Sequence, residues 1–257
     1  YFSGTSFFTL GLGDFAPRTS SARLAGVIEA GTGFGFLALV IGYLPVLYQA
    51  FSRRESSISL LDARAGSPPC ALELLRRYGI DNEPEGIGQL LQEWERWAAD
   101  LMESHLSYPL LAYYRSQHDN QSWIAALTTI LDASALVIAG IERVPLHPAR
   151  LTFALARHAA VDMSQVFNQQ PQNPARDRLP PGDLLRLRAT LSSANLAIRS
   201  GAAMDEKLAE LRSMYEPYVN ALSIYLLMPL PLWLPSPDAA DDWQASAWDR
   251  SRAMPLR

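Results

Sequence analysis

The chain has 257 residues, enough for one large domain or two smaller ones, and a formal net charge of −4. With 22 basic and 26 acidic side chains and no strongly basic half, the sequence argues against nucleic acid as a partner. The single cysteine, Cys70, excludes an intrachain disulfide and a cysteine-pair metal site. The sequence opens at Tyr1 within an apolar run, and we expect further residues upstream of it.

The first residues change character abruptly. Residues 1–8 are apolar and aromatic, and they lead directly into Thr9-Leu10-Gly11-Leu12-Gly13-Asp14. Glycine reaches the left-handed backbone region without a Cβ penalty, so glycines one residue apart permit alternating right- and left-handed conformations. Such an alternation turns consecutive carbonyls toward one side, where they can replace the water around a cation. The alternative is an ordinary glycine turn closed by an aspartate.

A long apolar segment follows. Residues 24–51 read LAGVIEAGTGFGFLALVIGYLPVLYQAF, and Glu29 is their only charged side chain. A bilayer core about 30 Å thick needs roughly 20 apolar residues in a helix, so this segment is predicted to span a membrane. A buried helix of a soluble protein is the alternative, but such helices usually run about 8–20 residues and show a polar face.

The remaining sequence predicts a helical domain between two less regular segments. Residues 53–69 are polar, carry several arginines and end in two prolines, so we expect a juxtamembrane linker. Apolar residues recur at i, i+3, i+4 and i+7 through 70–228, with proline and glycine breaks, which predicts a bundle of six or seven helices. Residues 229–257 are rich in proline, and we expect a disordered tail.

No catalytic motif stands out in this domain, so we expect no enzyme and no cofactor. The four histidines form neither an HExxH motif nor a cluster with cysteine, and no metal site is predicted. His158 and Asp162 are spaced to pair on one helix face. Residues 104–117 mix aromatic, polar and basic side chains, which fits a small-molecule pocket or an amphipathic interface between helices equally well.

Residues 1–52 resemble the bacterial two-transmembrane ion channel pore family, which is related to two-pore-domain potassium channels. The aromatic segment, the TLGLGD motif and the apolar segment resemble its pore helix, selectivity filter and inner helix. The resemblance implies that residues 9–13 bind K⁺ through their carbonyls and that Asp14 lies at the outer mouth. Leu12 stands where the family usually has an aromatic residue that braces the filter, and Phe8 replaces a frequent hydroxyl residue.

The resemblance also suggests roles along the inner helix. Gly33 lies 19 residues after Asp14, where the family hinge falls, although close helix packing explains a glycine equally well. We expect Glu29, a costly charge in a membrane, either to form a hydrogen bond behind the pore helix or to extend to the outer interface. The side chains expected to form the inner cavity or gate are Phe34, Leu37, Ile41 and Pro45, the last of which either kinks the helix or is simply tolerated.

The sequence thus predicts an all-α protein with a partial pore domain over 1–52, an outer helix upstream, and a cytosolic helical bundle. The expected function is passive, selective conduction of K⁺, the permeant ion being the only ligand. One filter strand cannot surround an ion, so we expect a homotetramer in membrane lipid, or a dimer if a second filter lies upstream. The family orientation makes this a multi-pass cell-membrane protein whose residues after about 52 are cytoplasmic.

Two alternatives remain open at this point. The first is a non-selective cation channel, because Leu12 lacks the aromatic brace. The second is a helical sensor or interaction domain carried on a degenerate, pore-like membrane anchor.

Overall fold

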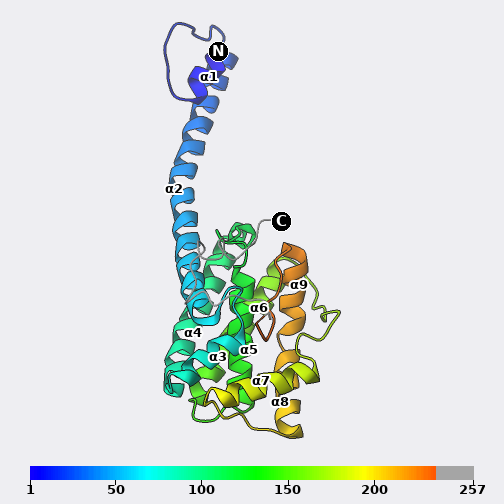
Figure 1. The fold of residues 1–257 in the computed structure, drawn as a ribbon. Helices are drawn as coiled ribbons and strands as arrows, with labels where there is room; N and C mark the ends of the chain where they lie inside the picture. The colour runs from blue at the N-terminus through cyan, green and yellow to red at the C-terminus, as the bar shows by residue number, and fades with distance from the viewer. Residues whose placement is uncertain (236–257) are drawn as a thin grey trace, which may run out of the picture. The chain divides into compact units, whose positions relative to one another are not determined.

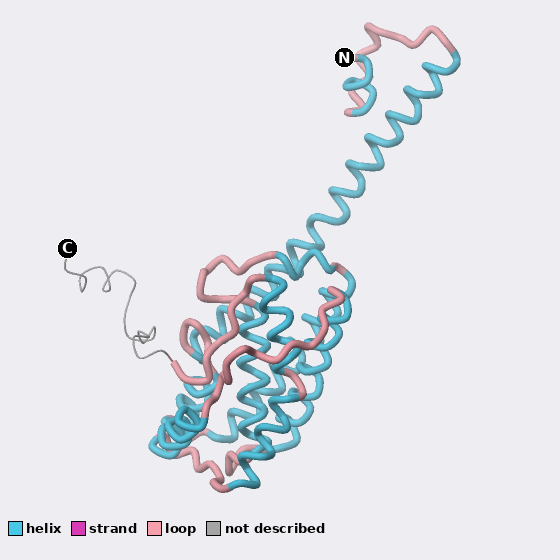
Figure 2. Tube along the Cα trace, turned by 90° about the vertical axis from the view of Figure 1, so that its right-hand side faces the viewer, coloured by secondary structure: helices cyan, strands magenta, loops and turns pink. Residues whose placement is uncertain are grey.

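The structure, a computed structural model, describes residues 1–235, and all of their regular secondary structure is helical (Figures 1 and 2). The only β pairing among these residues is an isolated bridge between Ile141 and Ile198. The prediction of an all-helical fold is therefore confirmed for the described part of the chain. Its residues form two compact units, Tyr1–Ser52 and a second unit that begins at Arg53.

Helix α2 (Ser20–Ala65) begins in the first unit and ends in the second. Its last turns differ from the expected linker, because residues 53–65 continue the helix. Ile58, Leu61 and Ala65 are buried in the core of the second unit, where their spacing forms one apolar stripe. The polar residues between them hid this stripe in the sequence. The segment expected as a linker is thus mostly a packed helix.

The second unit is a helical bundle built around α5. Its helices are α3 (Ala71–Ile80), α4 (Pro84–Ser107), α5 (Trp123–Ala139), α6 (Leu146–Val166), α7 (Pro181–Ser193), α8 (Ala202–Ser213) and α9 (Glu216–Leu226), with a 3₁₀ turn, η1 (Pro109–Tyr113). Every residue of α5 from Trp123 to Val137 is buried, as expected for a helix that is apolar all round. Helices α3, α4, α6, α8 and α9 all pack against it.

A buried ionic cluster joins α5 to the C-terminal half of this bundle. The carboxylate of Asp132, at the centre of α5, has no exposed surface. Arg178 donates to it at 2.7 and 3.2 Å and to Glu216 at 3.0 Å, and the Tyr215 hydroxyl donates a further bond to Asp132. Because a buried charge is costly unless it is paired, this cluster fixes how α9 and the segment before α7 meet α5.

The chain after α9 differs from the expected disordered tail over its first residues. Trp233 is fully buried, with the guanidinium carbons of Arg178 and Arg212 at 5.7 and 5.6 Å from its ring centroid. Its carbonyl accepts a hydrogen bond from the Leu72 N–H at 3.3 Å. Residues 229–235 are therefore an ordered segment anchored in the core by Trp233, through cation–π contacts and backbone bonding. The rest of the expected tail lies outside the described residues.

Arg54 attaches α2 to the helical bundle. Its side chain is buried and donates to the carbonyls of Leu111 at 2.9 Å and Tyr114 at 2.7 Å, and it also pairs with Glu55. The guanidinium of Arg54 also lies 3.3 Å from Nε2 of the buried His105. Since a guanidinium only donates, this ring nitrogen must accept, and Nδ1 donates to the Leu101 carbonyl at 2.8 Å. His105 is therefore held as a neutral ring.

Replacing Arg178 by methionine tests the buried cluster. Arg178→Met keeps much of the side-chain volume but leaves Asp132 and Glu216 without their shared cation, so the free energy of unfolding should fall by about 3–5 kcal/mol. Arg186→Met is the matched control, because the ion pair of Arg186 with Asp183 is exposed and should contribute no more than about 1 kcal/mol. Denaturant unfolding followed by tryptophan fluorescence measures both, and equal losses would contradict this role.

The neutral ring of His105 predicts sensitivity to acid. Burial, and then the charge of Arg54, lowers the pKa of His105 to about 3, so this residue takes up its proton only when the chain unfolds. Its contribution to stability is complete above about pH 6.5 and is lost as the pH falls toward 3, amounting to about 2 kcal/mol at pH 5. His105→Gln, which retains an acceptor for Arg54, should reduce the stability difference between pH 7 and pH 5 by that amount. Denaturant unfolding at both pH values measures it, and an unchanged difference would argue for a ring that is already charged in the fold.

Candidate functional site

The first unit is built on direct backbone contact between α1 (Phe2–Phe7) and α2. A Cβ atom placed on Gly33 would lie 1.8 Å from the carbonyl oxygen of Phe7, a distance that no side chain tolerates. A Cβ on Gly26, seven residues earlier and so on the same helix face, would touch the ring of Phe2 at 3.4 Å. Gly33 thus lies at a close approach of the two helices, and its role as a hinge stays a prediction.

A polar contact lies between these two glycine contacts. The hydroxyl of Ser3, on α1, donates a hydrogen bond to the carboxylate of Glu29, on α2. Glu29 lies near the same face of α2 as Gly26 and Gly33, at i+3 and i−4 from them. The bond corresponds to the hydrogen-bonding interpretation of Glu29. Sequence reasoning did not identify Ser3, although the spacing of Gly26, Glu29 and Gly33 was a signal that could have indicated a second helix on this face.

The backbone of residues 9–13 alternates in hand. Thr9, Gly11 and Gly13 have positive φ angles of 56°, 54° and 78°, whereas Leu10 and Leu12 between them do not. A positive φ is unrestricted for glycine but strained for the β-branched Thr9. The N–H of Thr9 is held by the Ser6 carbonyl at 3.1 Å, which keeps the strained residue attached to the end of α1.

Two hydrogen bonds set the direction of the carbonyls in this segment. The N–H groups of Leu10 and Gly11 both donate to the carbonyl of Thr5, on α1, at 2.8 and 3.3 Å. In a planar trans peptide the C=O points opposite to the N–H of the next residue. The carbonyls of Thr9 and Leu10 therefore both point away from α1, toward the same side. This is the arrangement that cation coordination by consecutive peptides requires.

The loop after this segment folds back onto the start of α1. The Tyr1 hydroxyl forms a hydrogen bond with the carboxylate of Asp14, and the Tyr1 and Phe15 rings meet edge to face at 5.6 Å. Asp14 is thereby tied to the first residue before α1. Tyr1 is another contact residue that sequence reasoning missed, because only the return of the chain brings it beside Asp14.

In the single chain, the apolar side chains of this unit are largely exposed. The side chains of Leu10 and Leu12 are 63% and 62% exposed. On α2, more than half of the surface of Phe34, Leu37 and Ile41 is exposed as well. Among the described helices, α2 is long and apolar enough to cross a membrane, and only 6% of its most apolar window is buried. A soluble core helix would be covered by protein, so this surface requires lipid or other subunits. The helix runs without a break through Pro45, which supplies no N–H for the Ile41 carbonyl.

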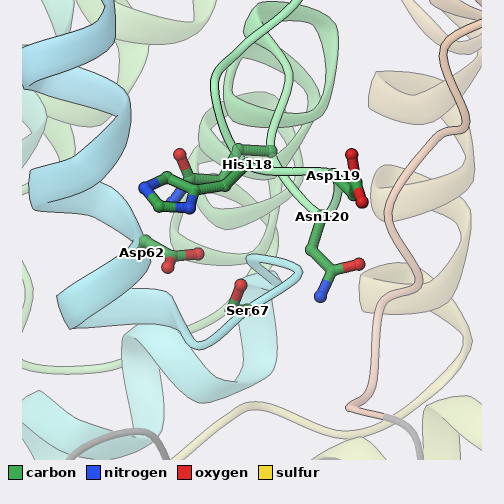
Figure 3. A pocket seen from close by; sticks show the side chains of 6 residues that line it. Asp62, Ser67, His118, Asp119 and Asn120 are labelled. Atoms are coloured by element: carbon green, nitrogen blue, oxygen red, sulfur yellow. The ribbon is translucent and has the colours of Figure 1, made fainter. Parts of the chain in front are cut away.

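A small polar pocket in the second unit is a separate candidate. Asp62 and Ser67, near the end of α2, and residues 118–121 line a hollow of about 230 Å³, into which the side chains of Asp62 and His118 point (Figure 3). Ligand pockets usually measure about 300–1,000 Å³ and are mostly apolar, so this one does not fit a drug-sized ligand. It lies just beyond residues 104–117, which were expected to line a pocket or an interface. No group of metal-ligating side chains occurs among the described residues.

Substitution of Gly33 tests the contact between α1 and α2. Gly33→Ala should displace α1, because the new methyl group meets the Phe7 carbonyl, and amide hydrogen exchange over residues 2–11 should accelerate. Gly35→Ala is the control on the same helix, since a Cβ there meets nothing within 4 Å. If Gly33 acted only as a hinge, the amides of residues 2–11 would exchange as slowly in Gly33→Ala as in the unmodified protein.

Comparison with known proteins agrees with this division of the chain. The family described as "Ion channel" matches residues 1–49. The chain is also 24% identical over 187 residues to the uncharacterized membrane protein YdjJ of Bacillus subtilis (strain 168), an alignment that covers 73% of this chain and 54% of the relative. The chain thus spans about half the length of that curated relative, and the alignment extends well beyond the first 49 residues. No solved structure matches. The first unit is therefore similar to ion channels, and the similarity to a membrane protein includes part of the helical domain.

Proposed function

We propose that this chain is a subunit of a potassium-selective channel and that residues 9–13 form its filter. The observation that carries the proposal is the pair of hydrogen bonds from Leu10 and Gly11 to the Thr5 carbonyl, which leaves the preceding carbonyls facing one side. The alternating φ angles over 9–13 extend the same geometry along the segment. The ion channel family match over residues 1–49 supports this function. K⁺ is the permeant ion, and no other cofactor is proposed.

A single chain supplies only one side of such a pore. A dehydrated K⁺ ion needs carbonyl oxygens around it, so we propose a homotetramer with cyclic symmetry, or a dimer if another filter precedes Tyr1. Leu10 and Leu12, exposed in the single chain, would then be covered by neighbouring subunits. Helix α2 crosses the cell membrane as one of several spans, and the unit that begins at Arg53 lies in the cytoplasm.

The remaining residues of the first unit support the pore in this proposal. Asp14, held by Tyr1, attracts cations at the outer mouth. Gly33 and the bond between Ser3 and Glu29 fix the pore helix against the inner helix. The exposed side chains of α2 that face the central cavity and lead to the gate are Phe34, Leu37 and Ile41, followed by Pro45.

The helical domain regulates or assembles the channel in this proposal. Helix α2 continues from the membrane segment into the domain, and Arg54 binds the carbonyls of Leu111 and Tyr114. A movement of the inner helix would therefore pull on η1 and on the α4 end that carries His105. This gives a mechanical route between the bundle and the pore without assigning the stimulus.

One observation favours a second candidate, a non-selective cation channel. The side chain of Leu12 has no polar group, so it cannot brace the segment by a hydrogen bond. A weakly braced filter would admit Na⁺ as well as K⁺. The third candidate, a helical sensor on a degenerate anchor, predicts no conduction at all.

Ion flux through the purified, reconstituted full-length protein tests the proposal. In mixed K⁺ and Na⁺ gradients, the reversal potential should lie close to that of K⁺. Gly11→Ala should abolish the K⁺ current, because an alanine Cβ strains the positive φ at that position. Gly4→Ala is the matched control on α1, where a Cβ meets nothing within 4 Å, and its current should match that of the unmodified protein.

The alternatives predict different results in this experiment. Equal permeability to K⁺ and Na⁺ would contradict potassium selectivity and support the non-selective cation channel. A complete lack of conductance with correctly folded protein would favour the anchor. Loss of current in both glycine variants would remove the specific role of residues 9–13.

A further inference from the structure

An aromatic patch lies at one end of the helical domain, with four exposed side chains around one half-buried phenylalanine. We define it as Leu110, Tyr113, Phe167, Tyr225 and Leu227. The rings of Tyr113 and Phe167 lie 5.6 Å apart, those of Phe167 and Tyr225 5.5 Å apart, and the two tyrosine hydroxyls share a hydrogen bond of 2.7 Å. Leu110 is 52% exposed and Leu227 is 74% exposed, so the apolar side chains extend outward around the rings.

Three separate elements converge to build this patch. Leu110 and Tyr113 belong to η1, where residues three apart lie on the same side of a 3₁₀ turn. Phe167 caps the C-terminal end of α6, and Tyr225 and Leu227 lie at the C-terminal end of α9. Figure 1 shows α7 and α8 toward the opposite end of the bundle from the C-terminal end of α9.

Two hydrogen bonds from one arginine side chain fix the edge of this patch. Arg115 donates to the carbonyls of Leu226 and Leu227 at 3.3 and 3.2 Å, which joins the chain after η1 to the end of α9. Leu227 has a left-handed backbone, with φ of 55°, and so ends the helix with its side chain outward. An apolar group held outward by specific bonds indicates a surface that contacts something other than water.

Arg54 connects this patch to the part of α2 that follows the proposed membrane span in the sequence. The apolar segment of α2 ends at Phe51, and Arg54 follows three residues later, about 4.5 Å further along the helix axis. Arg54 binds the carbonyls of Leu111 and Tyr114, which flank Tyr113 in the sequence. The turn that carries Leu110 and Tyr113 is therefore bonded to a residue of α2 that follows the apolar segment by three positions.

We propose that the aromatic patch is a membrane-contact surface that rests on the interfacial region of the cytoplasmic leaflet. Tyrosine suits this region because its ring is apolar and its hydroxyl is polar, and tyrosines are enriched at membrane interfaces. The exposed Leu110 and Leu227 would insert toward the acyl chains at the same level. The proposal depends on α2 spanning the membrane as proposed above, but not on the identity of the permeant ion. The contact would hold the domain against the bilayer where α2 leaves it.

Spin-label accessibility in vesicles tests this contact directly. The full-length protein carrying Leu110→Cys is labelled with a nitroxide and reconstituted in phosphatidylcholine vesicles. The native Cys70 is buried, and replacing it by serine in every variant removes its thiol. Collisions with oxygen, which concentrates in lipid, and with a water-soluble nickel chelate are then measured by power saturation. At residue 110 the ratio of oxygen to nickel collisions should exceed that at a water-exposed site severalfold.

Two matched positions make the outcomes distinct. Leu185→Cys on α7 is 65% exposed and should give the water value, whereas Leu39→Cys on α2 is 63% exposed and should give the lipid value. A water value at residue 110 with a lipid value at residue 39 would overturn the membrane contact and leave the span intact. Low collision rates with both reagents at residue 110 would show that protein, such as a neighbouring subunit, covers the patch. A ratio of oxygen to nickel collisions typical of water at residue 39 would contradict the proposal that α2 spans the membrane.

Discussion

The carbonyl of Thr5 is the group on which the proposed function depends. It lies in α1, accepts the N–H groups of Leu10 and Gly11, and so determines where the carbonyls of the next segment point. Backbone groups in a low-dielectric environment need hydrogen-bond partners. The Thr5 carbonyl satisfies the N–H groups of Leu10 and Gly11. In the proposed channel, the carbonyls of Thr9 and Leu10 would then bind the cation. The position of α1 matters in turn, and the contact of Phe7 with Gly33 sets it. The proposed filter geometry thus depends on Gly33, because the lack of a side chain there lets α1 approach α2.

Much of the first unit could be predicted from the sequence because its signals are local. Alternating glycines, and a 24–51 segment with one charged residue, require no knowledge of distant contacts. The role of Gly33 could not be decided in this way, since a hinge and a close approach call for the same residue type. The position of Phe7 adds a close approach at Gly33 that no sequence pattern contains. Tyr1 and Ser3 were missed for the same reason, because their partners Asp14 and Glu29 lie across a loop.

The second unit shows where local reasoning fails. The expected helical bundle is present in the described residues. The polar composition of 53–69 and the prolines between 229 and 235 indicated irregular chain, whereas the structure has a helix through Ala65 and a buried Trp233. Arg54 and Asp132 read as ordinary charged residues, yet Arg54 is buried against carbonyls 57 and 60 positions away. Asp132 is buried against Arg178 and Tyr215, which lie 46 and 83 positions away. A sequence window cannot contain such pairs. The energetics of the domain depend on them, because each buried charge would be costly without its partner.

The contact between Leu72 and Trp233 has a consequence for biosynthesis. These two residues are 161 positions apart, yet the N–H of one donates to the carbonyl of the other, and the tryptophan fills the core beside Arg178 and Arg212. Contacts of such long sequence separation form late. Helix α2 emerges from the ribosome early, so a growing chain would enter the bilayer while its bundle still lacked the residues that complete it. During that interval, exposed apolar helices would be tethered beside a membrane, and a chaperone that protects them would have to act at that surface.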